Sequence, residues 1–216
     1  MNLKKQFSTK QEQIRLLHDD EQVTRTMSKK ILSWLPTAAC DYIALFIGTD
    51  RSTGDALGPL AGTLFSEKKP RHMAVYGTLH QPVHATNLEA YVNYIQKVHR
   101  NPFIIAIDAC LGKSTSIGYL TAQKGPLQPG AAFNKPLPEI GDVHLTGIVN
   151  MSGFMEYAVL QNTRLAVVMD MARKLASIME QIDESLARPR RFSAAIPRQA
   201  IHDVPLPITE SGLPPH

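Results

Sequence analysis

Two short runs of apolar residues constrain this fold more than any other feature of the sequence. Residues 42–47 read Y-I-A-L-F-I and residues 103–107 read F-I-I-A-I. A loop with two aspartates follows the first run, and a single aspartate follows the second. A strand that is apolar on both faces must be covered on both faces, which is typical of parallel sheets flanked by helices. The runs therefore predict an α/β protein of three layers, α/β/α, with a central, mostly parallel mixed sheet.

The segments around these runs have the spacing that such a fold requires. Apolar residues recur at helical intervals over residues 57–69 and 88–98, and a short apolar segment at 72–76 predicts a further strand. The sequence T-N-L-E, from Thr86 to Glu89, predicts a capping box in which Thr86 is the N-cap of the second of these helices and Glu89 reaches back to it.

The alternation of strands and helices predicts a single α/β domain over residues 41–187. We expect residues 1–40 to form an N-terminal extension with a loosely held polar start and an amphipathic helix. The tail, residues 188–216, is basic and rich in proline and lacks apolar periodicity, so we expect it to be disordered. The other expected elements are strands at 117–122 and 143–149 and helices at 152–162 and 165–186.

The composition favours a compact protein that does not enter a membrane. Charged residues make up 19% of the chain and the formal net charge is only +4, with much of the basic excess in the tail, so nucleic acid is not an expected partner. No apolar run approaches the roughly 18 residues that span a bilayer, and no apolar signal segment begins the chain. Cys40 and Cys110, which lack CxxC spacing, favour a reducing compartment and a cytoplasmic location.

Aspartates follow both apolar runs and are the first candidates for chemistry. Asp50 and Asp55 lie in G-T-D-R-S-T-G-D-A-L-G-P, residues 48–59, and Asp108 follows the second run. Ligands of open α/β sheets bind beyond the carboxyl ends of parallel strands, so Asp108 and one loop acid would face one crevice. Two close carboxyl groups can share a proton, and one then acts as a base on water while the other holds a proton. Short acids before a helix also serve as simple caps, so this reading stays open for both loop acids.

Three stretches in order resemble the motifs of germination protease, a spore endopeptidase, and more closely those of its shorter relatives, the YyaC-type sporulation proteins. They are the loop sequence at 48–59, I-A-I-D-A at 105–109 and P-G-A-A-F-N-K at 129–135, within a resemblance that covers about residues 41–155. The resemblance implies a phosphorylase/hydrolase-like fold, shared with hydrogenase maturation proteases. It also implies a peptidase whose two catalytic aspartates fall on Asp55 and Asp108 of this chain.

The resemblance also implies what would surround the two aspartates. We expect Gly54, Lys113, Gly130 and Asn134 to border the same crevice, where the Asn134 amide would reach a substrate carbonyl or a carboxylate. The family pattern P-G-x-G-x-G-N becomes P-G-A-A-F-N here, so a close backbone approach that needs glycine would be altered. The implied substrate is a protein or peptide, with small acid-soluble spore proteins as the family's example, and the implied location is the forespore or the spore core.

His144, in G-D-V-H-L-T-G, allows a second interpretation of the same site. With Asp55 and Asp108 it would make two carboxylates and one imidazole, a set similar to the nickel-sensing site of hydrogenase maturation proteases and suited to a divalent transition metal. The other interpretation is a hydrogen-bonded histidine near the crevice, in a protein with no metal and no cofactor. We expect Cys110 to be packed rather than reactive.

Three functions remain open from the sequence. The first is a sporulation-associated peptidase with two aspartates, the second is a degenerate peptidase fold that binds a spore protein, and the third is a metal-dependent maturation peptidase. The absence of a G-x-S-x-G elbow and of a G-K-[ST] ending argues against a serine hydrolase and a P-loop enzyme. The oligomeric state stays open.

Overall fold

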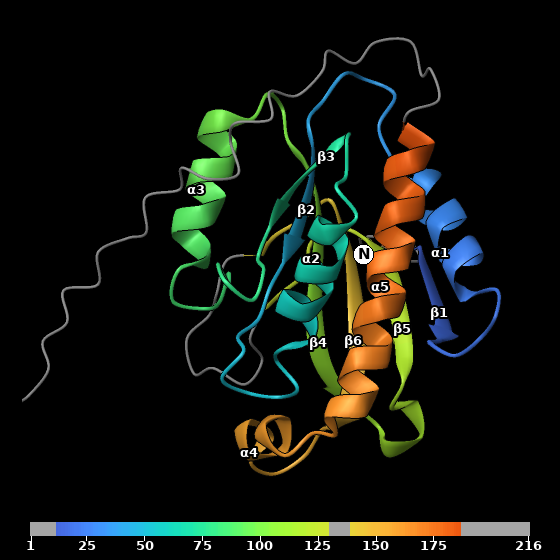
Figure 1. Cartoon of the computed structure of the whole chain (residues 1–216), viewed down its shortest axis with the longest axis vertical. Coiled ribbons are helices and arrows are strands. Elements are labelled where there is room, and N and C mark those ends of the chain that lie inside the picture. The colour runs from blue at the N-terminus through green and yellow to red at the C-terminus, as the bar shows by residue number, and fades with distance from the viewer. Residues whose placement is uncertain (1–11, 130–138, 187–216) are drawn as a thin grey trace, which may run out of the picture.

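Six strands form one central sheet in the computed structural model, which describes residues 12–129 and 139–186. The strands are Gln13–Leu17 (β1), Tyr42–Phe46 (β2), Met73–Tyr76 (β3), Phe103–Gly112 (β4), Tyr119–Lys124 (β5) and Val143–Met151 (β6). Their order is β1-β5-β6-β4-β2-β3, with β3, β2, β4 and β6 parallel and β5 antiparallel to both of its neighbours (Figure 1). The expected mixed, mostly parallel sheet is confirmed.

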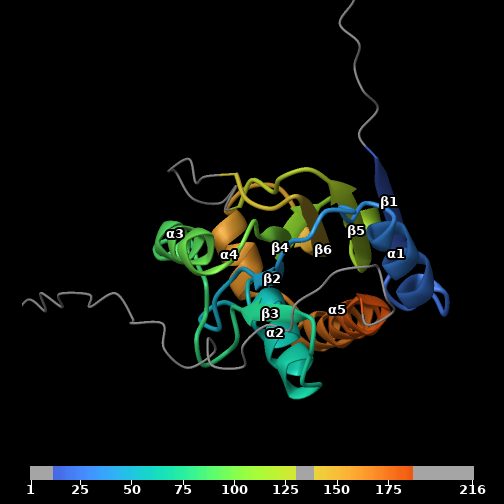
Figure 2. The same cartoon turned by 90° about the horizontal axis from the view of Figure 1, so that it is seen from above.

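Helices flank the sheet on both sides, as a parallel sheet requires. They are Val23–Leu32 (α1), Leu57–Glu67 (α2), Leu88–Val98 (α3), Glu156–Gln161 (α4) and Leu165–Leu186 (α5). Seen from above, α1, α2 and α5 lie on one side of the sheet, whereas α3 lies on the other side (Figure 2). The three-layer arrangement is therefore confirmed, with the second helical layer much the smaller of the two.

The run Y-I-A-L-F-I is apolar throughout because β2 supplies both halves of the core. Successive side chains of a strand point to opposite faces of the sheet. Ala44 and Phe46 pack among the residues of α1, α2 and α5, whereas Ile43 and Leu45 pack among those of α3. All four are completely buried, so the strand cannot move in register without exposing apolar surface.

The N-terminal part of the described chain is not loosely held, contrary to the sequence expectation. Residues 13–17 form the edge strand β1, which pairs antiparallel with β5. Ile14 and Leu16 pack against the same core cluster that contains the buried residues of α1. The tail from residue 187 onward lies outside the described residues, so the expectation of disorder there stays a prediction.

The start of α3 also differs from the expected capping box. Asn87, not Thr86, precedes the helix, and no side chain caps its first turn. The Thr86 hydroxyl instead bonds to His84 Nδ1 over 2.9 Å, and the Asn87 Oδ1 accepts the His84 amide over 2.8 Å. The preceding turn uses these two side chains, which leaves neither for the helix.

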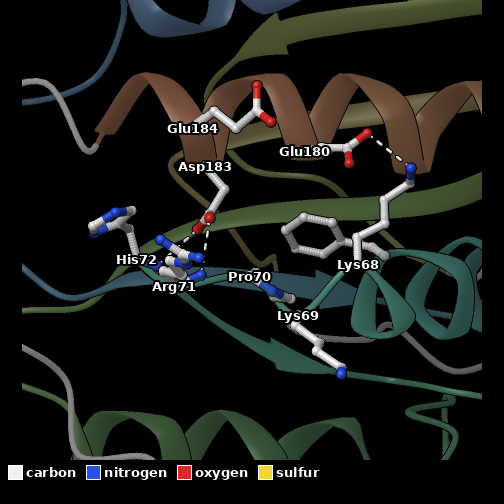
Figure 3. A pocket seen from close by; sticks show the side chains of 9 residues that line it. Lys68, Lys69, Pro70, Arg71, His72, Glu180, Asp183 and Glu184 are labelled. Atoms are coloured by element: carbon white, nitrogen blue, oxygen red, sulfur yellow. Dashed lines mark hydrogen bonds and ion pairs between the residues drawn. The ribbon is translucent and has the colours of Figure 1, made fainter.

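A pocket of about 360 Å³ lies at the end of the sheet where the parallel strands begin, between the last turns of α2 and α5 (Figure 3). Asp183 is buried there and accepts the backbone amides of Arg71 and His72 over 2.9 and 2.8 Å. Lys68 and Glu180 form an ion pair of 2.8 Å at its edge. Each carboxylate oxygen of Asp183 accepts one backbone amide, so this buried acid holds the loop before β3 in place.

Among the helices of residues 12–129 and 139–186, none is both long enough and apolar enough to cross a bilayer.

Candidate active site at the end of strand β2

The end of β2 brings the loop with the two acids beside Asp108. β2 ends at Phe46, which pairs with Ile107 on β4, and the Ile47 amide donates to the Ile107 carbonyl over 2.7 Å. β4 does not stop there as the sequence suggested. It continues to Gly112 along β6, with Asp108 opposite Thr146. Asp108 therefore lies within a strand, at the level where its neighbour β2 has just ended.

The loop folds back on itself so that Asp55 returns to the strand end. The Thr49 amide donates to the Asp55 carbonyl over 3.2 Å, which joins the two ends of the loop. Gly48 has φ of 144°, and a Cβ there would lie 2.0 Å from that same carbonyl oxygen. Gly58 in the first turn of α2 lies equally close to Ile47, since its Cβ would lie 2.0 Å from the Ile47 oxygen. Glycine at both positions lets the loop close against β2.

The segment around α4 holds the loop from its outer side. Gly54 is buried and donates its amide to the Leu160 carbonyl over 2.9 Å. A Cβ at Gly54 would lie 2.7 Å from Leu160 Cδ2 and 3.1 Å from Thr163 Oγ1. A larger residue at position 54 would therefore require Leu160 or its neighbours to move, and the expected role of Gly54 in the crevice stays a prediction.

Asp108 is the most perturbed acid of the site. The residue keeps some solvent exposure, yet protein surrounds its carboxyl group, and this burial raises the pKa to about 8. The Ala109 amide donates to Asp108 Oδ1 over 2.8 Å and lowers the pKa, whereas the nearby Asp55 raises it. Asp108 therefore carries a proton at neutral pH while remaining within reach of solvent.

Asp55 is the second acid of the pair. Burial raises its pKa, and Ser52 lowers it. The Ser52 hydroxyl is buried and makes no hydrogen bond of good geometry within the described residues, so it lies near Asp55 without being used by another group. Asp50 is exposed and lies near His84 instead. Burial and Arg51 lower the pKa of His84, and Asp50 raises it by a smaller amount.

The pair has the charge state that acid–base chemistry needs. Burial raises the pKa of both carboxyl groups, and it raises the pKa of Asp108 more than that of Asp55. Asp108 is therefore a proton donor at neutral pH and Asp55 is the candidate base, although the titrations of the two groups are coupled. Both lie beside the carboxyl end of the parallel strand β2, and such strand ends are the usual place of ligand sites in these sheets.

Of the remaining expected site residues, the structure describes His144 and Lys113. His144 is buried and pairs with Ala106, two pairs before Asp108, and its Nδ1 bonds to the Gly125 carbonyl over 2.9 Å. Lys113 is exposed, and no hydrogen bond or ion pair joins it to either aspartate in the part of the chain that the structure describes. Gly130 and Asn134 lie outside the described residues, so their place at the crevice stays a prediction.

The donor set expected for a transition metal does not come together. Over residues 12–129 and 139–186, no group of three or more His, Cys, Asp and Glu side chains is arranged to hold a metal ion. The His144 position on β6 is two residue pairs away from Asp108 along the β4–β6 ladder. The residues present therefore do not fit a resident metal bound by Asp55, Asp108 and His144.

Thr146 and Cys110 belong to the surroundings of Asp108, although the sequence gave no reason to select Thr146. Burial raises the pKa of Cys110 to about 11, a hydrogen bond from Thr146 lowers it, and Asp108 raises it. The expectation of a packed, unreactive thiol agrees with this raised pKa. Thr146 lies beside Asp108 only through the register of β4 and β6, which the local sequence does not reveal.

Comparison with known proteins places the chain among relatives. The model of a family described as "Protein of unknown function (DUF1256)" matches residues 15–178. "Uncharacterized protein YyaC" of Bacillus subtilis (strain 168) is 46% identical over 196 residues, which cover 89% of this chain and 96% of that protein. A solved structure of a [NiFe] hydrogenase maturation protease, HycI from Thermococcus kodakarensis KOD1, is similar with a TM-score of 0.48 and 17% identity, over 67% of this chain and 94% of that one. The resemblance to YyaC-type proteins is confirmed.

Proposed function

The chain belongs to the DUF1256 family, and from its site we propose that it is a peptidase in which Asp55 and Asp108 activate water to hydrolyse a peptide bond. One observation carries this proposal. Two carboxyl groups with raised pKa values lie near each other beside the carboxyl end of β2, and both residues keep some solvent exposure. Burying an acid that forms no ion pair is costly, which favours a chemical use for it.

The proposed reaction divides its proton transfers between the two acids. The Asp55 carboxylate takes a proton from a water molecule, whose oxygen then bonds to the carbonyl carbon of the substrate. Asp108 donates its proton to the substrate, so that the peptide C–N bond breaks and the amine leaves neutral. The proton gained by Asp55 then returns to Asp108 through solvent. The sum is one peptide bond and one water converted to a carboxylic acid and an amine.

The substrate in this proposal is a protein or peptide, as the resemblance to germination protease implies. We extend that relation to the setting, so that the protein would act in the cytoplasm of the forespore or in the spore core. Small acid-soluble spore proteins are then the first substrates to try. The proposal uses no metal, because the three residues considered for one do not form a binding group among the described residues.

The test is cleavage by the purified protein of an unfolded protein substrate and of a small acid-soluble spore protein, with products identified by mass spectrometry. We expect cleavage by the wild type, with and without a chelator, and a loss of at least about 100-fold in Asp55→Asn and in Asp108→Asn. Asp50→Asn is the matched control, because it makes the same change in the same loop on an exposed residue. Equal rates in all four proteins would trace the cleavage to a contaminant and overturn the proposal.

The exposed apolar segment after β6 favours one alternative function, a degenerate peptidase fold that binds a spore protein. Phe154 is 98% exposed, Met155 71% and Tyr157 56%, which is unusual for large apolar side chains so close together. The segment adjoins α4, which holds the loop of Asp55 through Gly54. Under this alternative the wild type and Asp55→Asn bind a spore protein equally and cleave none.

A further inference from the structure

The helices that the structure describes leave one face of the sheet uncovered over about half of its strands, and this face carries Asp108. Alternate residues of β1, β5 and β6 pack beneath α1, α2 and α5, so the residues between them point to the other side. There α3 packs with residues of β2 and β3 and with the start of β4 (Figure 2). Among residues 12–129 and 139–186, no helix covers the part formed by β1, β5 and β6, which we call the open face.

The register of the strands places a row of polar side chains across the open face. Asp108 on β4 pairs with Thr146 on β6, and Thr146 pairs with Thr121 on β5. Thr121 in turn pairs with Arg15 on the edge strand β1. Three strand spacings of about 4.8 Å separate the ends of this row, so the Cα atoms of Arg15 and Asp108 lie about 14 Å apart. An extended peptide spans that distance with about four residues.

The Arg15 guanidinium is held in place without being neutralised. Its Cζ lies 4.2 Å from the centroid of the Tyr119 ring, a contact that restricts an otherwise mobile side chain. Arg15 is exposed, and no carboxylate of the described residues forms an ion pair with it. Burial and Thr146 have the largest effects on the Cys110 pKa, but Asp108 raises it and Arg15 lowers it. The positive charge of Arg15 therefore acts on Cys110, which lies beside the candidate site.

A planar guanidinium that is oriented by an aromatic ring and lacks an ion partner is suited to bind a carboxylate. We propose that Arg15 binds an acidic side chain, Asp or Glu, of a polypeptide that lies across the open face from Asp108. Thr146 and Thr121 line the path between the two ends with hydroxyl groups, and Tyr119 supports the acid-binding end. The distance places the bound acid about four residues from the bond at the Asp55–Asp108 pair. That last statement rests on the proposed function, whereas the binding itself does not.

The test measures binding separately from cleavage. Twelve-residue peptides of one neutral sequence carry a single Glu that is moved one position at a time, and each has a matched peptide with Gln. Affinities are measured by calorimetry in the Asp55→Asn background. We expect Glu to improve affinity by about 10-fold over Gln at low salt and less at high salt. Arg15→Gln should remove that preference, Tyr119→Leu should weaken it, and Arg25→Gln should leave it unchanged, because Arg25 is an exposed arginine of α1.

Arg15→Lys keeps the charge but loses the planar group, so it gives a second variant should Arg15→Gln fold poorly. With it we expect a reduced preference for Glu. A preference that survives in Arg15→Gln, or that falls equally in Arg25→Gln, overturns the proposal, as does the absence of any Glu-dependent binding at millimolar peptide. Arg15-dependent binding with no cleavage by the wild type would reject the peptidase and leave this site standing. Cleavage without a Glu preference would do the reverse.

Discussion

The Gly54 amide donates to the Leu160 carbonyl over 2.9 Å, and this bond joins the loop of Asp55 to α4. Loops are usually the mobile parts of a protein, and a catalytic carboxyl needs a fixed position. The loop is fixed at both sides here, by Leu160 on the outside and by the closure of Thr49 onto the Asp55 carbonyl on the inside. The position of Asp55 therefore depends on a residue more than 100 positions away in the chain.

The first prediction follows from that contact. Gly54→Ala places a methyl group 2.7 Å from Leu160 Cδ2 and 3.1 Å from the Leu160 oxygen, so the loop or α4 must shift. We expect a loss of about 1–3 kcal/mol in the free energy of unfolding and a fall in activity larger than the stability loss explains. Denaturant unfolding and cleavage rates measure the two effects. Gly153→Ala is the control, because a Cβ there meets nothing within 4 Å. Equal behaviour of the two variants would contradict the tight fit.

The second prediction concerns the pH dependence of kcat/KM. Activity requires Asp55 ionised and Asp108 protonated. Because burial raises the pKa of Asp55, the acid limb should lie above the ordinary carboxyl value of about 4. The alkaline limb should lie near pH 8, where Asp108 loses its proton. We therefore expect a bell-shaped profile, measured with one peptide at substrate concentrations well below KM. A rate that keeps rising through pH 9 would contradict the role given to Asp108.

Continuous apolar strands could be predicted from the sequence because their pattern is local. The run 42–47 is apolar at every position since β2 is buried on both faces. β1 was missed because an edge strand buries only one face, and Ile14 and Leu16 are too few apolar residues to distinguish a strand from a loosely held segment. Its polar residue Arg15, which lies level with Asp108, was missed for the same reason.

The site could be predicted only in part, because its geometry depends on pairing between distant strands. The residues alone favoured a turn role for Asp50 and left Asp55 open between a cap and a catalytic acid, and the choice of Asp55 came from the resemblance. The structure gives that choice a physical basis, since Asp55 and not Asp50 raises the pKa of Asp108. The end of β4 was predicted too early because Ala109 to Gly112 lose the apolar pattern while still pairing with β6.

A third prediction tests the buried hydroxyl beside Asp55. Ser52 lowers the pKa of Asp55, so Ser52→Ala should raise it and move the acid limb of the profile upward by about 0.5–1 pH unit. The alkaline limb, set by Asp108, should stay in place. The stability should change little, because the hydroxyl makes no good hydrogen bond within the described residues. Thr53→Ala removes a neighbouring hydroxyl as the control, and equal shifts in both variants would remove Ser52 from the site.

The last prediction separates a functional from a structural role for Asp108 by its effect on stability. The folded protein holds the pKa of Asp108 near 8, whereas an unfolded chain has a value of about 3.9. A raised carboxyl pKa means that the folded state prefers the protonated form. Its contribution to stability is therefore fully present below about pH 4 and is lost progressively as the pH rises to 8.

Asn cannot ionise, and its amide oxygen can still accept the Ala109 amide that Asp108 Oδ1 accepts in the wild type. Asp108→Asn should therefore be more stable than the wild type by about 2–4 kcal/mol at pH 8, with the difference shrinking toward pH 4. Denaturant unfolding at pH 5 and pH 8 measures it. Asp170→Asn, which changes an exposed residue of α5, is the control and should change the free energy of unfolding by less than about 0.5 kcal/mol at either pH. A variant that gains stability while losing cleavage shows an acid kept for chemistry at a cost to the fold. A variant destabilised at both pH values would show instead that Asp108 holds the structure together.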